Sequence, residues 1–69
     1  MNRVPVASSN VASIGFDEES CTLEVEFNNG SVYQYFDVPS YLHSELMSAD
    51  SVGSYLARNI KGSYGYQRV

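Results

Sequence analysis

The residues that form disulfide bonds and transition-metal sites are nearly absent from this chain. Its 69 residues include one cysteine, Cys21, and one histidine, His43. A lone cysteine excludes an internal disulfide and a cysteine-cluster zinc site, and it suits a reducing compartment. We therefore expect no metal, no cofactor and a cytoplasmic location.

Long hydrophobic runs are also missing. No stretch has the length of a signal peptide's apolar region or the roughly 20 apolar residues of a membrane-spanning helix, so we expect no membrane partner. Hydrophobic residues still make up 43% of the chain, as in folded globular proteins. At this length the core is thin. We expect a flexible N-terminal tail over residues 1–7 and a single domain over residues 8–69.

Positive charge is scarce and unevenly placed. Eight acidic residues outnumber four cations, which gives a net charge of −4 and argues against a general affinity for nucleic acid. All eight acids, however, lie before residue 58, whereas Arg58, Lys61 and Arg68 follow without any acid. Cations also favour the C-terminal end of a helix, which is a purely structural explanation for Arg58 and Lys61.

Alternating apolar and polar residues predict three strands in the first half of the chain. Residues 8–16 form the first candidate. In the second, Leu23, Val25 and Phe27 alternate with polar side chains, the pattern of a strand with one buried face. An Asn-Asn-Gly turn then leads into a third strand over residues 31–38, so the two make a hairpin.

Helical spacing begins where the third strand ends. Pro39 favours an extended residue before it and suits the first turn of a helix. Asp50 or Ser51 is placed to cap a second helix, which Gly62 ends. These elements predict an α+β fold: an antiparallel three- or four-stranded meander followed by two short helices packed on one face. The predicted core consists of Leu23, Val25, Phe27, Leu42, Leu46, Leu56 and Ile60.

The direction of Tyr33 and Tyr35 depends on the length of the hairpin turn. A two-residue turn would place both tyrosines outside and Gln34 among the apolar side chains. A three-residue turn that ends in Gly30, in a left-handed conformation, would place both tyrosines on the core side. Burying Gln34 costs more than burying a tyrosine whose hydroxyl reaches the rim, so we favour the three-residue turn.

Several segments resemble a known family in their order and spacing. The stretches "SSNVASIGFD", "LEVEFNNGSVYQYFDVP", "ADSVGSYLARNI" and "YGY" are together similar to the KTSC domain, a small family named after the C-terminal domain of some lysyl-tRNA synthetases. The likeness covers residues 8–66. Its motif positions are Tyr33, Tyr35, Val38, Pro39, Ala49, Ser51 and Gly53, and we expect them to be structural. Where the family tends to have an aromatic residue followed by Asn, this chain has Leu56 and Ala57.

The resemblance does not specify a reaction, but the link to a tRNA-handling enzyme implies RNA as a partner. In residues 58–68, cations alternate with aromatic rings, which suits the phosphates and bases of single strands. We predict weak binding of single-stranded RNA along Arg58, Lys61, Tyr64, Tyr66 and Arg68. In the alternative interpretation, Tyr64 and Tyr66 form a fourth, edge strand and the cations are merely solvated.

A different function class is a protein-interaction module. The three-residue turn would place Val32 and Phe36 on the outer face of the sheet, where they could form an apolar contact surface. Catalysis has little support, because His43 lies in mid-helix, and Glu24 and Glu26 fit a solvated strand face. We therefore predict a non-catalytic domain.

Overall fold

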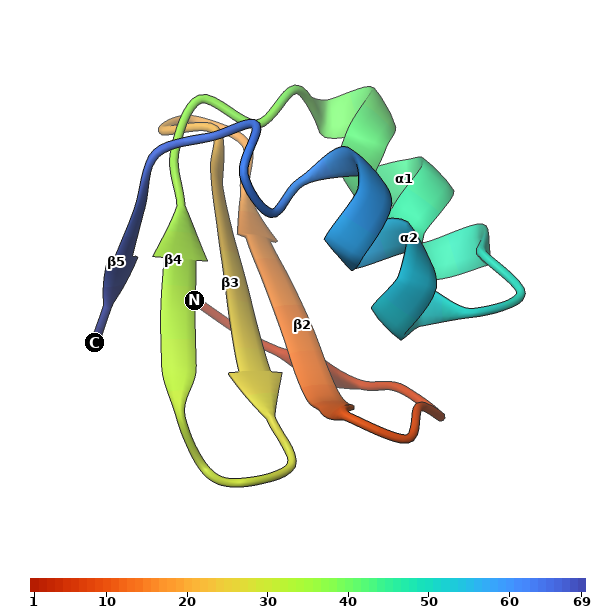
Figure 1. Cartoon of the computed structure of the whole chain (residues 1–69). Helices are drawn as coiled ribbons and strands as arrows, with labels where there is room; N and C mark the ends of the chain where they lie inside the picture. Colours follow the sequence, from red (N-terminus) through yellow and green to blue (C-terminus); the bar gives the residue numbers. More distant parts are fainter.

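The structure is a computed structural model that describes all residues from 1 to 69. Five antiparallel strands form one sheet in chain order, and both helices lie between the fourth and fifth strands (Figure 1). This confirms the α+β prediction and adds strands at both ends of the chain. The elements are β1 (Val4–Pro5), β2 (Val11–Asp17), β3 (Thr22–Phe27), β4 (Val32–Tyr35), α1 (Ser40–Ser48), α2 (Val52–Asn59) and β5 (Tyr66–Arg68).

The β3–β4 hairpin has the three-residue turn that we predicted. Val25 is paired with Tyr33, and Leu23 with Tyr35. The backbone N–H of Phe27 donates to the carbonyl of Ser31 at 2.9 Å, which leaves residues 28–30 as the turn. Gly30 ends it with a φ of 90°, a conformation that costs glycine little. Both tyrosines therefore share the helix-facing side of the sheet, the inner face.

Local signals define the two helices as expected. Pro39 is the N-cap residue of α1, with an extended backbone, because its fixed φ and missing N–H suit a helix start. Ser51 caps α2, and its hydroxyl accepts a hydrogen bond from the N–H of Ser54 at 3.3 Å. Leu42 and Leu46 are the buried residues of α1, while Val52 and Leu56 are those of α2.

The core lies between the two helices and the inner face of the sheet. Six of the seven predicted core residues are buried, and Phe27 is the exception because it is only partly buried. The prediction that both tyrosines lie on the core side is confirmed, since Tyr35 is 3% exposed and Tyr33 is partly buried and packs against the core. The full buried apolar set is Val11, Ile14, Leu23, Val25, Tyr35, Val38, Leu42, Leu46, Val52, Leu56 and Ile60.

The two chain ends contribute the edge strands. β5 pairs with β4, with Tyr66 opposite Tyr35, so the alternative of an additional edge strand is correct for Tyr66. β1 pairs with β2 within the segment that we expected to be a tail. Arg3 reaches the outer face of the sheet and its Nη1 donates to Glu24 Oε2 at 2.7 Å. The mobility of residues 1–7 stays a prediction.

Replacing Leu46 with Ala should lower the free energy of unfolding by about 2 to 5 kcal/mol, because the side chain is fully buried and its removal leaves a cavity. Chemical denaturation measures this change. The matched control is Tyr41→Ala in the same helix: Tyr41 is 62% exposed, so its loss should change stability by less than about 0.5 kcal/mol. Equal effects of the two substitutions would contradict the described core.

Replacing Gly30 with Ala should cost about 1 to 2 kcal/mol, the cost of a left-handed conformation for a residue with a side chain. No atom lies within 4 Å of a Cβ built at Gly30, so steric contact adds nothing to this cost. Gly65→Ala is the control, because it also meets open space but at an ordinary φ. If thermal unfolding shows the same Tm for both variants, the three-residue turn is wrong.

Candidate nucleic-acid interface

The helices do not cover the whole inner face of the sheet. Figure 1 shows α1 and α2 beside β2, whereas β4 and β5 lie toward the opposite edge of the sheet, away from the helices. Over this uncovered part lies an open groove of about 700 Å³, which we call the inner-face groove. It is lined by Ser9, Asn10, Phe27, Asn28, Asn29, Ser31, Tyr33, Tyr35, Lys61, Gly62 and Tyr66.

Four aromatic rings from three neighbouring strands form the floor of this groove. The Phe27 and Tyr33 rings meet edge to face, with centroids 5.8 Å apart, and the Tyr66 ring lies 5.9 Å from Tyr33 and 6.0 Å from Tyr35. Tyr66 is 63% exposed, while Tyr35 lies beneath it and is buried. Burial raises the pKa of the Tyr35 hydroxyl, with smaller contributions from Tyr33 and Tyr66. Tyr33 and Tyr66 are therefore the tyrosine rings that a ligand can reach.

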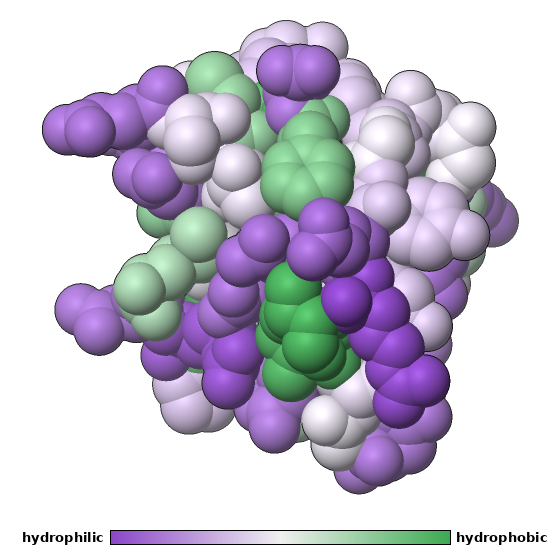
Figure 2. All heavy atoms as spheres, turned by 90° about the vertical axis from the view of Figure 1, so that its left-hand side faces the viewer, coloured by the Kyte–Doolittle hydropathy of each residue, from purple (hydrophilic) through white to green (hydrophobic).

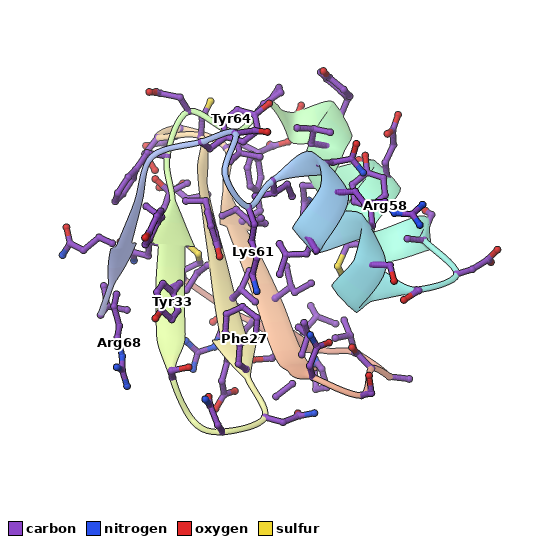
Figure 3. The ribbon with its side chains drawn as sticks, in the orientation of Figure 1. Phe27, Tyr33, Arg58, Lys61, Tyr64 and Arg68 are labelled. Atoms are coloured by element: carbon purple, nitrogen blue, oxygen red, sulfur yellow. The ribbon has the colours of Figure 1, made fainter.

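Two cations flank the aromatic floor. The Lys61 ammonium lies 4.9 Å from the centroid of the Phe27 ring, a cation–π contact that holds the charge over the groove. Arg68 is paired with Tyr33 across β4 and β5, so alternation places its side chain on the inner face as well. In Figure 3 Lys61 extends from the end of α2 toward Phe27, and Arg68 lies on the opposite side of Tyr33.

Negative charge is kept away from the groove, because none of the eight acidic residues lines it. Two of the acids occupy the outer face of the sheet, where each has polar partners. Glu24 accepts hydrogen bonds from Arg3 at 2.7 Å and from Gln34 at 2.8 Å, and Glu26 accepts one from Ser13 at 2.9 Å. The inner-face groove thus combines aromatic rings with positive charge in a chain that is acidic overall.

Asparagine side chains form one end of the groove. Asn28 and Asn29 belong to the hairpin turn, and Asn10 comes from the loop between β1 and β2. The Asn28 amide ties the two segments together, since its Nδ2 donates to the carbonyl of Ser9 at 3.0 Å. We did not predict from the sequence that five of the lining residues belong to a site: Asn10, Asn28, Asn29, Phe27 and Tyr33. The alternation of the strands, combined with the three-residue turn, was the available signal for Tyr33.

The structure brings together three of the five residues that we predicted to bind RNA. Lys61 and Tyr66 line the groove, and Arg68 lies at its margin. Arg58 points away from Phe27 and Tyr33, on the far side of α2 (Figure 3). Tyr64 is partly buried and packs against the core, so it supports the fold rather than the groove.

The motif residues have structural positions. Tyr35 and Val38 are core residues, and Ser51 caps α2. Gly53 lies in the first turn of α2, directly against Asn10. A Cβ built at Gly53 would overlap Asn10 Oδ1, so no side chain fits there unless Asn10 moves.

Other candidate sites gain little from the structure. The His43 ring stacks on Phe16, with centroids 4.9 Å apart. No cluster of three or more His, Cys, Asp or Glu side chains is arranged to hold a metal ion. None of the helices has the length and apolar character needed to cross a membrane.

Seen from the β5 edge, apolar residues form small separate patches with hydrophilic residues between them (Figure 2).

Comparison with known proteins gives a consistent result. The model of the KTSC domain family matches residues 7–64. A KTSC domain protein from Yersinia pestis has a crystal structure that superposes with a TM-score of 0.94 at 39% identity, covering 99% of this chain and 96% of that one. A protein of uncharacterised function from Stutzerimonas stutzeri is 40% identical, over 100% of this chain and 99% of its own length.

Longer proteins contain a similar segment. A lysine–tRNA ligase from Trichormus variabilis is 41% identical over 54 residues, which is 78% of this chain but only 10% of the ligase. A ligase from Nostoc punctiforme is 33% identical over 59 residues and is likewise matched over 10% of its length. The present chain spans about a tenth of these ligases.

The contact between Gly53 and Asn10 predicts a stability difference that depends on both residues. In the wild-type background Gly53→Ala forces the Asn10 amide to move, which offsets the gain of up to about 1 kcal/mol that Ala brings to a helix. In an Asn10→Ala background the obstacle is gone, so the same substitution should give the full gain. Urea denaturation of the four variants measures the coupling, and strictly additive effects would contradict the contact.

Proposed function

The chain belongs to the KTSC domain family, and we propose that it is a non-catalytic module that binds single-stranded RNA weakly through the inner-face groove. The proposal includes a cytoplasmic location, where RNA is available. It differs from the sequence-based hypothesis in the residues involved. Phe27, Tyr33, Lys61, Tyr66 and Arg68 now carry the contact, while Arg58 and Tyr64 do not.

The observation that carries the proposal is the combination of accessible rings and unopposed cations on one surface. Single strands bind where aromatic side chains stack on bases and cations contact phosphates. Tyr33 and Tyr66 provide the rings, and Lys61 and Arg68 flank them without any acid in the groove. A double helix does not fit this chemistry, since its bases are already stacked and paired.

Two cations set a limit on affinity. Each phosphate contact adds a modest, salt-dependent contribution to the binding free energy. Because the groove offers few such contacts, we expect dissociation constants no tighter than about 10⁻⁴ to 10⁻⁶ M at physiological salt. Stacking on each accessible ring adds about 1 to 3 kcal/mol and tolerates any base. The module would therefore act as an accessory to a larger assembly rather than as a tight binder on its own.

The relatives support RNA as the ligand. Similar segments occur in proteins named lysine–tRNA ligase, in which the matched part is a small fraction of the chain. An appended domain that touches RNA without catalysing a reaction fits that arrangement. This support is an analogy at the level of the domain, so the groove itself carries the argument.

The protein-interaction alternative has weaker support. It requires an apolar outer face, but Val32 is paired there with Glu26, and the neighbouring pair on that face is Glu24 with Gln34. Phe36 lies beyond the end of β4 and does not pack against the core. Polar pairs thus interrupt the surface on which an apolar contact would depend.

The proposal predicts that charge reversal at Lys61 weakens RNA binding at least tenfold, while the same change at Arg58 has a much smaller effect. The two residues lie three positions apart at the end of α2, but only Lys61 lines the groove. Tyr66→Ala should also weaken binding, because about 1 to 3 kcal/mol of stacking is lost. Tyr66 is mostly exposed, so this variant should remain folded.

Titration of the full chain with labelled single-stranded RNA at about 50 mM salt, followed by amide NMR shifts, provides the measurement. Shifts should appear in β4, β5 and the loop around Lys61. Equal weakening by Arg58→Glu and Lys61→Glu would mean that general charge, and not the groove, binds RNA. Absence of shifts at millimolar RNA would end the proposal and favour a protein partner.

A further inference from the structure

The asparagine end of the groove carries an inference about which bases the groove accepts. In Asn28 and in Asn29, one of the two polar atoms of the side-chain amide is hydrogen-bonded to other groups of the protein. Asn28 Nδ2 donates to the carbonyls of Ser8 and Ser9, at 3.4 and 3.0 Å. Asn29 Oδ1 accepts from the N–H and hydroxyl of Ser31, at 3.0 and 2.6 Å. Because these partners include backbone carbonyls in one case and a backbone N–H in the other, they determine which way each amide is turned.

The third amide, that of Asn10, is oriented by the hydroxyl of Ser8, and the direction of that hydroxyl proton follows from the other hydrogen bonds of Ser8. Ser8 Oγ accepts from the N–H groups of Asn10 and Val11, at 3.3 and 3.2 Å. Both lone pairs of that oxygen are then used, so its proton is donated to Asn10 Oδ1 at 3.0 Å. Gly53 leaves the space in which the Asn10 amide lies.

The free halves of the three amides therefore form a definite set. Asn10 Nδ2 and Asn29 Nδ2 are donors, and Asn28 Oδ1 is an acceptor, and none of these three atoms has a hydrogen-bond partner within the protein. The hydroxyl groups nearby rotate to donate or accept, so they discriminate little between bases. Amides whose direction is determined by internal bonds do discriminate, since the wrong partner leaves a polar group unpaired.

From this set we propose that the groove prefers pyrimidine bases, a specificity that rests on the proposed RNA-binding function. In number, the pairing edges of uracil and cytosine each present one donor and two acceptors, which complements two donors and one acceptor. The donor is central in uracil and terminal in cytosine, so the spatial order of the three amide atoms favours one of these two bases over the other. Guanine presents the opposite balance, and adenine has one donor and one acceptor on that edge. The base stacks on the ring of Tyr33 or Tyr66 while its edge meets the amides.

Stacking alone would give the opposite order. Purines have the larger aromatic surface, so a platform that used only stacking would bind oligoadenosine at least as well as oligouridine. A preference for pyrimidines therefore has to come from the amides. A good set of edge hydrogen bonds discriminates between bases. We expect a preference of about tenfold, which corresponds to about 1.4 kcal/mol.

The test compares short oligouridine, oligocytidine and oligoadenosine as ligands of the full chain by NMR titration. We expect at least one of the two pyrimidine oligomers to bind about tenfold more tightly than oligoadenosine. In Asn29→Asp a carboxylate oxygen replaces the Nδ2 donor, while the acceptor for Ser31 is retained, so the hairpin turn keeps its hydrogen bonds. The ratio between the affinities for the more tightly bound pyrimidine and for adenosine should then fall toward one.

Gln67→Glu is the matched control, because Gln67 is paired with Gln34 on the outer face and the substitution adds the same charge to the neighbouring strand. It should weaken all three oligomers alike and leave their ratio unchanged. Self-stacking of oligoadenosine is a property of the ligand, so it does not change between variants. If wild-type protein binds adenosine as tightly as either pyrimidine, or if Asn29→Asp keeps the wild-type ratio, the pyrimidine preference is wrong while the RNA-binding function stands. If no oligomer shifts the groove resonances, the function itself fails.

Discussion

The three-residue turn between β3 and β4 is the constraint on which the rest of the structure depends. Side chains alternate along a strand, so one residue more or fewer in the turn would exchange the two faces of β4. With Gly30 in its left-handed conformation, Tyr33 and Tyr35 join Val25 and Leu23 on the inner face. β5 follows this register, which brings Tyr66 and Arg68 to the same face. The core and the groove are thus both consequences of one local backbone choice.

The groove exists because a small domain has too few helical residues to cover its sheet. α1 and α2 are nine and eight residues long, and they bury the part of the inner face that belongs to β2 and β3. The rings of Tyr33 in β4 and Tyr66 in β5 remain partly open, and no acidic residue lines the groove around them. Incomplete burial usually weakens a domain of this size. Under the proposed function, the exposed aromatic surface is the region that contacts RNA.

Much of the fold could be predicted from sequence because its signals are local. The alternation in Leu23, Val25 and Phe27 indicated a strand, and Pro39 marked the change to helical spacing. The turn length followed from the cost of burying Gln34. Two-residue β1 carries no such signal, since its pairing with β2 depends on the tertiary structure.

The composition of the site was harder to predict, because it depends on contacts between distant segments. Asn10 and Asn28 meet at the end of the groove although 17 residues separate them, and Gly53 leaves the space for Asn10. Sequence proximity was misleading in the C-terminal segment. Arg58 precedes Lys61 by less than one helical turn, yet the end of α2 directs only the second cation over Phe27.

Under the proposed function, a groove with low affinity for RNA suits a domain that is joined to a larger RNA-binding protein. Covalent attachment turns a second contact into an intramolecular one, with an effective concentration that reaches millimolar for short flexible linkers. A site with a dissociation constant of about 10⁻⁴ M is then mostly occupied once the main protein is bound, although it would capture little RNA alone. Under the proposed function, a segment that forms a tenth of a lysine–tRNA ligase needs no high affinity of its own. Under the proposed function, the same arithmetic implies that a copy without such an attachment holds RNA only weakly, because Lys61 and Arg68 supply few phosphate contacts.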